Sequence, residues 1–308
     1  MMRIIKTWAD IPAGARGASV AMGNFDGVHL GHQAVIDLAR GKAPLGIVTF
    51  EPHPREFFSP SAPPFRLMNA EARANRLAKL GVETLFELPF DQAMASLTPE
   101  AFARDVLAKG LGVSHVVVGA DFCFGAGRKG KVADLQAMGA EMGFAVTVAE
   151  LIRHGDREIS STAIRQALAV GQPREAAAML GHWHRIEGEV IHGEKRGREL
   201  NFPTANMSVA GLHLPRFGVY AVKVDVLSGP QAGSYQGAAS LGVRPHFGGA
   251  APNLETFLFD FKGDLYGHHL SVALVEYLRP EMKFDGLPGL LAQMAADCDR
   301  AREILAEA

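Results

Sequence analysis

The hydrophobic pattern of this chain changes near residue 180, and that change limits the possible folds more than any other feature. Before it, short apolar runs alternate with stretches of helical periodicity, which is typical of a parallel sheet with connecting helices. Thr98 and Pro99 add a clear helix start, as N-cap and first helical residue. The expected strands are 18–22, 46–50, 84–88, 115–119 and 145–149, and the expected helices are 31–40, 70–80, 132–142, 161–170 and 173–180.

After residue 180 the chain becomes a series of strand-like runs separated by turns with Gly, Pro and Asp. Several strands at this spacing predict an antiparallel barrel or sandwich. We therefore expect an α/β domain at 1–182 and an all-β domain at 183–308, and a length of 308 residues suits two domains. The runs are 186–191, 218–226, 236–241, 255–259 and 270–278, followed by an amphipathic helix at 287–306.

Composition narrows the class of protein. The formal net charge is −2, whereas a generic nucleic-acid binder carries a basic excess. The N-terminus lacks the apolar core of a signal peptide, and no apolar run approaches the ~18 residues that span a membrane. Cys123 and Cys298 lie far apart in sequence and do not suggest a disulfide framework. We expect a soluble, cytoplasmic protein with no nucleic-acid or membrane partner, and the sequence carries no signal for its oligomeric state.

A glycine-punctuated turn follows the first strand and opens a helix; it reads Gly23-Asn24-Phe25-Asp26-Gly27-Val28-His29-Leu30-Gly31-His32. Glycines let the backbone approach a phosphate, and a helix N-terminus attracts anions. His29 and His32 are three residues apart, so they share one face and can stabilise phosphate charge. The alternatives are ordinary surface histidines or a metal pair, although no third ligand is apparent nearby. The position after the first strand favours a nucleotide site.

A second candidate phosphate segment is 157–165, which reads Arg-Glu-Ile-Ser-Ser-Thr-Ala-Ile-Arg. Its hydroxyls can cap a helix and hold phosphate, and Arg165 can fork onto phosphate oxygens. Alone, this segment would be a plain N-cap followed by a solvated arginine. Combined with the histidine motif, it indicates the far wall of one triphosphate site.

The C-terminal half carries a third candidate at 193–206, which combines glycines, three close cations and a Pro-Thr-Ala-Asn turn. Glycines and backbone amides can cradle phosphates, and Thr204 and Asn206 offer oxygens suited to Mg²⁺. The stretch lacks the ending of a Walker A loop, and a solvated basic hairpin tip is the alternative. Glu255, on an expected strand, is a candidate base for phosphoryl transfer, unless it only occupies the solvated face of that strand.

The first two segments together resemble the (H/T)xGH and ISSTxxR motifs of the cytidylyltransferase-like nucleotidyltransferases. The stretches 49–54 and 119–125 look like the flavin-side and nucleotide-side loops of prokaryotic FAD synthetases, with Cys123 where Arg or Thr is commoner. The resemblance implies a Rossmann-like domain in which His29, His32 and Arg165 stabilise the ATP phosphates. It also implies ATP contacts at Gly23, Phe25, Asp26, Gly31, Asp121, Ser160, Ser161 and Thr162, and flavin contacts at Pro52, Pro54, Phe58 and Phe124.

The third segment resembles the GxPTAN signature of riboflavin kinases, with Asn201 in place of the usual glycine. The stretches 241–248, 264–267 and 278–284 are similar to further loops of that family, with His246 in place of a threonine. The resemblance implies a kinase barrel with a terminal helix, Mg²⁺ at Thr204 and Asn206, and Glu255 as the catalytic glutamate. It also implies ATP contacts at Gly193, Lys195, Gly197, Arg198 and Pro203, and flavin contacts at Arg279 and Phe284.

The two resemblances together imply a bifunctional enzyme that phosphorylates riboflavin to FMN and adenylylates FMN to FAD. ATP, riboflavin, FMN and FAD would be its substrates and products, with Mg²⁺ accompanying ATP and no tightly bound redox cofactor. One alternative, an adenylyltransferase for another phosphate such as phosphopantetheine, leaves the Pro-Thr-Ala-Asn turn and Glu255 unexplained. The other, a non-catalytic flavin-binding protein, predicts loss of phosphate-site residues that are all present.

Overall fold

The computed structural model describes residues 2–150, 153–154, 157–192, 202–246 and 249–308. The chain forms two compact units, and each is described by itself. The α/β unit comprises Met1–Pro63 and Arg73–Ile159, and the barrel unit comprises Pro64–Ala72 and Ser160–Ala308. Within the described part of the chain, no helix is long and apolar enough to cross a membrane.

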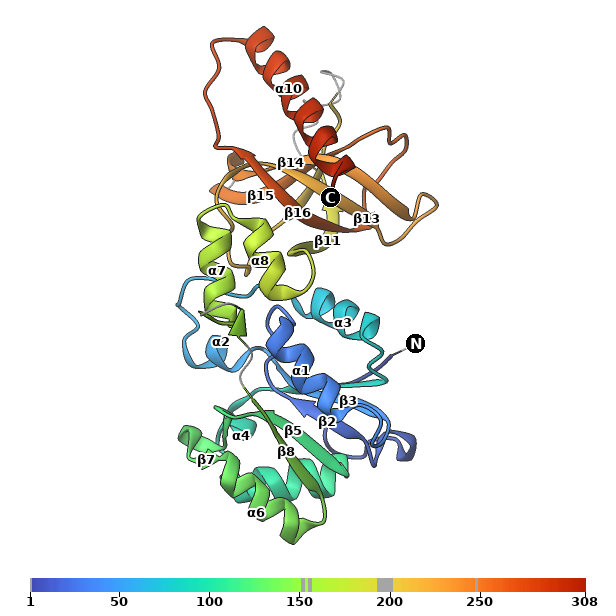
Figure 1. Ribbon diagram of the computed structural model, residues 1–308, viewed down its shortest axis with the longest axis vertical. Helices are drawn as coiled ribbons and strands as arrows, with labels where there is room; N and C mark the ends of the chain where they lie inside the picture. The colour runs from blue at the N-terminus through green and yellow to red at the C-terminus, as the bar shows by residue number, and fades with distance from the viewer. Residues whose placement is uncertain (1, 151–152, 155–156, 193–201, 247–248) are drawn as a thin grey trace. The chain divides into compact units, whose positions relative to one another are not determined.

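The α/β unit is built on a six-stranded parallel sheet (Figure 1) with the order β1-β4-β3-β2-β5-β8. All five expected strands are present. The sixth, β1, is a short and mostly exposed edge strand without the apolar pattern that would have predicted it. The strands are β1 Arg3–Ile5, β2 Ser19–Met22, β3 Leu45–Glu51, β4 Thr84–Pro89, β5 His115–Gly119 and β8 Ala145–Ala149.

Helices cover both faces of this sheet, which explains why its inner strands are mostly apolar. Val20, Val48 and Val116 face the core that includes the π-helical segment Phe102–Leu111, whereas α1 packs against β2, β3, β5 and β8. Thr98 caps the short helix α5 through its Oγ1, 3.1 Å from Ala101 N, which confirms that helix start. The helices are α1 Leu30–Ala39, α2 Pro54–Phe58, α3 Ala70–Lys79, α4 Gln92–Ala95, α5 Pro99–Ala101 and α6 Val132–Met142.

The α/β unit also contains two short pairs of antiparallel strands outside the main sheet. β6 Cys123–Phe124 pairs with β7 Gly130–Lys131, and β9 Arg153–His154 pairs with β10 Arg157–Glu158. Gly125, between β6 and β7, has φ +71°, and a Cβ there would lie 2.7 Å from Pro99 N. Glycine therefore permits both the left-handed turn and the close approach of two backbones.

The barrel unit contains a closed, antiparallel, six-stranded barrel with the order β11-β12-β15-β14-β13-β16. Because the ring of strands is closed, the predicted barrel is confirmed and the alternative of a sandwich is wrong. The short strand β12 was not predicted because its four residues carry a loop-like Asn and Ser. The strands are β11 Arg185–Ile191, β12 Ala205–Ser208, β13 Gly218–Val226, β14 Gly233–His246, β15 Gly249–Leu258 and β16 His269–Arg279.

The barrel is filled by alternate residues of its strands and covered outside by the last helix. Leu241, Leu254 and Leu274 are fully buried in the interior core. Outside, α10 Leu287–Ala306 packs on β13, β14 and β16 through Ala301 and Leu305 (Figure 1). These elements confirm a Rossmann-like α/β part followed by an antiparallel barrel with a terminal helix.

Two helices, α7 Ser161–Ala169 and α8 Pro173–Leu180, group with the barrel unit, where α8 packs on β16. The compact units therefore divide the chain between Ile159 and Ser160. The expected domain boundary at residues 182–183 stays a prediction.

Candidate active sites

His29 and His32 form a stacked imidazole pair at the start of α1. Their ring centroids are 3.7 Å apart with an interplanar angle of 18°, and Nδ1 of His29 caps the helix by accepting from His32 N at 3.3 Å. His32 Nδ1 is buried and has no hydrogen-bond partner among the residues that the structure describes. Burial, and then the charge of His29, hold the pKa of His32 well below its usual value. A neutral imidazole with an unpaired buried nitrogen is the kind of group that a ligand satisfies.

The loop that leads into this pair is mostly buried. Phe25 is 1% exposed with a positive φ of 52°, and its ring lies 5.2 Å from that of His32. Asp26 is buried, whereas Gly23 is half-buried. A Cβ at Gly31 would lie 3.1 Å from the ring of His29, so a side chain there would push against the imidazole pair.

The expected flavin-side loop follows β3 and leads into α2. His53 caps α2, because its Nδ1 accepts from Arg55 N at 3.0 Å while Glu56 Oε2 accepts from His53 N at 3.0 Å. Pro52 is exposed and Pro54 is the first residue of α2. Phe58 is 65% exposed and forms edge-on contacts with Phe57 and Phe90. An exposed aromatic ring at this loop is a surface onto which a flavin ring could stack.

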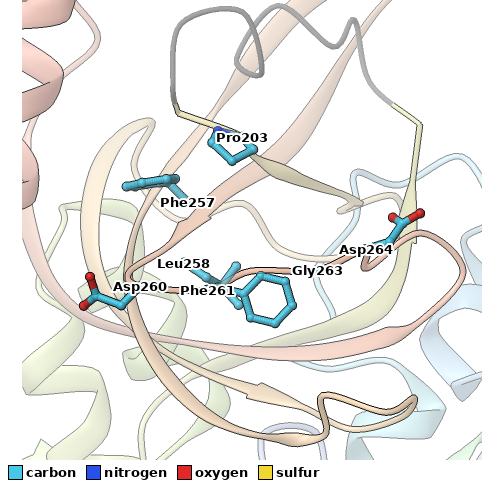
Figure 2. A pocket seen from close by; sticks show the side chains of 7 residues that line it. All are labelled: Pro203, Phe257, Leu258, Asp260, Phe261, Gly263 and Asp264. Atoms are coloured by element: carbon cyan, nitrogen blue, oxygen red, sulfur yellow. The ribbon is translucent and has the colours of Figure 1, made fainter.

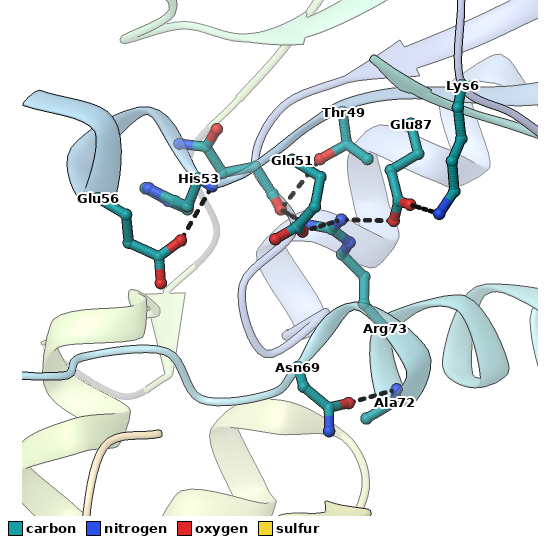
Figure 3. A network of polar contacts seen from close by, with 10 residues as sticks. Lys6, Thr49, Glu51, His53, Glu56, Asn69, Ala72, Arg73 and Glu87 are labelled. Carbon is teal, nitrogen blue, oxygen red and sulfur yellow. Dashed lines mark hydrogen bonds and ion pairs between the residues drawn. The ribbon is translucent and has the colours of Figure 1, made fainter. Parts of the chain in front are cut away.

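A buried arginine that sequence reasoning missed ties these loops together (Figure 3). Arg73 is 1% exposed, and its Nη2 donates to Glu51 Oε2 at 2.8 Å and to Glu87 Oε1 at 2.9 Å. The backbone oxygen of Asn24 accepts from Arg73 Nη1 at 3.5 Å and from Thr49 Oγ1 at 3.3 Å. One guanidinium therefore connects the loop after β2 with the ends of β3 and β4.

The expected nucleotide-side loop at 119–125 divides into exposed and buried parts. Asp121 is exposed, but Phe124 is only 6% exposed and packs against Phe102 and Phe122 in the core. The ring of Phe124 therefore does not lie on the surface. Lys131 Nζ lies 3.2 Å from Cys123 Sγ, and this hydrogen bond is the main cause of a lowered pKa of the Cys123 thiol.

The serine segment begins α7 in the barrel unit. Ser160 caps the helix, accepting from Ala163 N at 3.3 Å, while Ser161 is half-buried and Thr162 is exposed. Arg165 Nε donates to the backbone oxygen of Phe65 at 2.6 Å, and its guanidinium lies 5.4 Å from the centroid of that ring. Because the histidine pair belongs to the other unit, a shared triphosphate site stays a prediction.

The barrel brings Asn206 and Glu255 directly opposite each other on β12 and β15. A third residue, Asn253, was missed; its Nδ2 donates to Asn206 Oδ1 at 3.1 Å and to Glu255 Oε1 at 3.4 Å. Asn206 Nδ2 in turn donates to the backbone oxygen of Thr204 at 3.3 Å. The only local signal for Asn253 was its spacing of two from Glu255, which places both side chains on one face of a strand.

A cavity of about 680 Å³ lies in the barrel unit beside the Pro-Thr-Ala-Asn turn. Figure 2 shows Pro203 and the aromatic rings of Phe257 and Phe261 around it, with Asp260 and Asp264 at its sides. A second cavity of about 250 Å³ is lined in part by Thr204 and Tyr266. Apolar rings with a few polar groups are typical of a site for a small organic ligand.

Other expected kinase residues are engaged elsewhere or lie outside the described residues. Arg279 forms a forked ion pair with Asp297 of α10, with contacts of 2.7 to 3.0 Å, and its guanidinium lies 5.8 Å from the ring of Phe284. The structure therefore gives the Arg279 guanidinium an intramolecular partner. Gly193, Lys195, Gly197, Arg198 and Asn201 lie outside the described residues, as does the side chain of His246.

The comparisons with known proteins assign a class to each half. Residues 11–163 match the family model described as FAD synthetase, and residues 180–305 match the one described as riboflavin kinase. The chain is thus a two-part transferase with nucleotidyltransferase and kinase modules. It belongs to the bifunctional riboflavin kinase/FMN adenylyltransferase family, as its relatives show.

Two such relatives match almost end to end. The bifunctional riboflavin kinase/FMN adenylyltransferase of Pseudomonas fluorescens is 39% identical over 99% of this chain and 98% of its own length. That of Escherichia coli K12 is 40% identical over 93% of this chain and 92% of its own. A crystal structure from Streptococcus pneumoniae, described as a macrolide-efflux protein, superposes with a TM-score of 0.82 at 32% identity and covers 98% of both chains.

Proposed function

We propose that this enzyme makes FAD in two ATP-dependent steps, and that separate sets of residues serve the two steps. The barrel unit phosphorylates riboflavin to FMN, and the α/β unit, with the serine segment of α7, joins FMN to the adenylyl group of ATP. The observation that carries the proposal is the hydrogen-bonded group of Asn206, Asn253 and Glu255. It places a candidate base, Glu255, beside a candidate oxygen ligand for Mg²⁺, Asn206, on one face of the barrel. Flavins are substrates and products here, and no redox cofactor is required.

In the kinase step, Glu255 accepts the proton of the 5′-hydroxyl of riboflavin while that oxygen takes the terminal phosphoryl group of ATP. ADP leaves and FMN is formed. Thr204 and Asn206 present neutral oxygens, which suit Mg²⁺ because it is a hard ion that prefers oxygen ligands. When bound there, Mg²⁺ would neutralise charge on the ATP phosphates. Pro203 and the rings of Phe257 and Phe261 offer the surface for the nucleotide.

In the adenylyl step, a phosphate oxygen of FMN attacks the α-phosphorus of ATP and pyrophosphate leaves. The chain forms no covalent intermediate, so its contribution is positioning and charge stabilisation. His29 and His32 donate hydrogen bonds to the phosphates, together with the amides at the N-terminus of α1. Arg165 would do the same from α7, after exchanging the oxygen of Phe65 for a phosphate oxygen. Phe58, Pro52 and Pro54 offer the flavin surface.

A time course tests both steps at once. Purified protein is incubated with riboflavin, ATP and Mg²⁺, and the flavins are separated by chromatography. We expect FMN first and FAD later, with both steps stopped by a chelator of Mg²⁺. FMN that accumulates without FAD would contradict the proposed adenylyl step, and FAD formed only from supplied FMN would contradict the kinase step. We also infer a cytoplasmic enzyme, since both cysteines are free thiols, as is usual in a reducing compartment.

A further inference from the structure

Asn253 lies on the same strand face as the two polar residues assigned to the kinase step. It precedes Glu255 by two residues on β15, and side chains two apart on a strand point to the same side. Across the β12–β15 ladder, Asn206 lies opposite Glu255 and Ser208 lies opposite Asn253. Asn253 is 9% exposed and Asn206 is 8% exposed, so neither amide is well hydrated. Their hydrogen bonds are therefore met mainly by the protein.

The amide nitrogen of Asn253 contacts both neighbours. Its Nδ2 is 3.1 Å from Asn206 Oδ1 and 3.4 Å from Glu255 Oε1. An amide NH₂ carries two hydrogens, so it can serve both acceptors at the same time. The other end of the Asn206 amide donates to the backbone oxygen of Thr204 at 3.3 Å. Asn206 is thus held at both ends, and its Oδ1 atom is fixed in direction.

We propose that Asn253 is a positioning residue for the kinase step: its amide holds the Glu255 carboxylate and the Asn206 oxygen in one arrangement. This inference rests on the proposed function of those two residues and adds the group that links them. Asn253 need not contact the substrate. A hydrogen bond to a carboxylate stabilises its charged form, which is the form that accepts a proton, and restricts its rotation.

Asn253→Asp is the most informative variant because it keeps the shape and removes both donated hydrogens. The new carboxylate faces Glu255 and disfavours a second negative charge there. We expect the kcat for FMN formation to fall roughly 10- to 100-fold, the value of one or two hydrogen bonds to a charged group. The KM for riboflavin should stay unchanged.

Two further variants separate positioning from charge and from folding. Asn253→Ala removes the donors without adding charge, so it should lower kcat and leave the KM for riboflavin unchanged. Ser208→Asp adds the same charge at the exposed residue opposite Asn253, where water weakens its effect on neighbouring charges. It should keep the kcat of the parent enzyme. FAD formation from supplied FMN checks in every variant that the other unit is intact.

The outcomes decide between this inference and the function beneath it. If Asn253→Asp and Asn253→Ala retain the parent kcat while Glu255→Gln is inactive, Asn253 has no positioning role and Glu255 keeps its own. If Glu255→Gln is as active as the parent, the assignment of the base fails instead. A loss that appears in the KM for riboflavin rather than in kcat would assign Asn253 to substrate binding and would also overturn the proposal.

Discussion

Single side chains of the two units are assigned to different reactions, so each reaction can be removed separately. Glu255 lies on β15 of the barrel unit, and His29 caps α1 in the α/β unit. FMN is the product of the kinase step and the substrate of the adenylyl step. Supplying FMN therefore bypasses the first reaction and tests the second by itself.

The pair Glu255→Gln and His29→Asn should give opposite results. Glu255→Gln removes the proton acceptor, so FMN formation should fall at least about 100-fold while FAD formation from supplied FMN stays intact. His29→Asn keeps a side chain that can cap α1 but loses the imidazole, so FAD formation should fall by about 100-fold and FMN formation should continue. Chromatography of each reaction measures both rates. Loss of both activities in either variant would contradict the separation of the two steps.

Buried histidine makes the barrel unit sensitive to acid. His184 is 3% exposed, and burial is the main cause that lowers its pKa to about 3, with smaller contributions from His182 and His213. The folded form keeps His184 neutral, whereas the unfolded chain takes up a proton below about pH 6.5. The stability that depends on a neutral His184 should therefore be fully present above that pH. The free energy of unfolding should decrease as the pH falls from about 6.5 towards 3.

His184→Gln should flatten that decrease. Uptake of one proton changes the free energy of unfolding by at most about 1.4 kcal/mol per pH unit. The slope of that free energy against pH, between pH 6 and pH 4, should therefore drop by up to this amount in the variant. Above pH 7.5 the two proteins should differ by a constant. Denaturant melts followed by the fluorescence of Trp183, in a Trp8→Phe background, report on the barrel unit. Equal slopes for the two proteins would show that His184 is not the group that titrates.

At the scale of elements, ion pairs as well as apolar packing hold α3 against strands β3 and β4 of the parallel sheet. Arg73 lies within α3, and its guanidinium forms ion pairs with two carboxylates. These are Glu51 at the end of β3 and Glu87 within β4. Lys6 Nζ lies a further 3.6 Å from Glu87 Oε2 (Figure 3). Since Glu87 is only 5% exposed, its charge depends on Arg73 for compensation.

Arg73→Met should destabilise the α/β unit by about 3–5 kcal/mol, the usual cost of removing one partner of a buried ion pair. Arg73→Lys keeps the charge but loses the fork, so it should lie between the parent and Arg73→Met. Trp8, which packs against the core of this unit, can follow denaturant unfolding in a Trp183→Phe background. The control is Arg104→Ala, because Arg104 forms an exposed pair with Asp105 and should leave the midpoint unchanged. A midpoint for Arg73→Met equal to that control would contradict the structural role.

At the scale of the whole molecule, the closed barrel is complete within residues 185–279 and its outer helix ends at 306. Nothing in the hydrogen-bonded ring of strands comes from the first half of the chain. The segment Pro64–Ala72 belongs to the barrel unit but lies outside the ring of strands. Asn69 Nδ2 donates to the backbone oxygen of Glu187 at 2.9 Å, and the backbone oxygen of Arg66 accepts from His213 N at 2.8 Å.

The piece 183–308 should therefore fold alone and phosphorylate riboflavin. It should be less stable than the same unit in the full chain, because it loses these two hydrogen bonds and the packing of α8 on β16. Circular dichroism and the chromatographic assay check folding and activity. A longer piece, 160–308, restores α7 and α8 as a comparison. A piece 183–308 that folds but makes no FMN would show that the kinase needs the preceding residues, and would contradict the predicted domain boundary.

The sequence by itself determined the features that depend on local pattern. Strands such as His115–Gly119 and helices such as Pro173–Leu180 were predicted residue by residue. Apolar period, caps and turn residues act over a few positions, so they can be read along the chain. The motifs around His29 and Thr204 indicated phosphate chemistry for the same reason, because the backbone and side chains that would contact a phosphate there are neighbours in sequence.

Tertiary structure decided which distant side chains meet. Arg73 looks like any helix arginine until folding brings Glu51 and Glu87 to it, and the Arg279 guanidinium expected at a flavin is bound to Asp297. Asn253 acquires two partners only through the register of β12 against β15, which closure of the barrel sets. Pairings of this kind join residues far apart in the chain, and a local pattern carries no information about them.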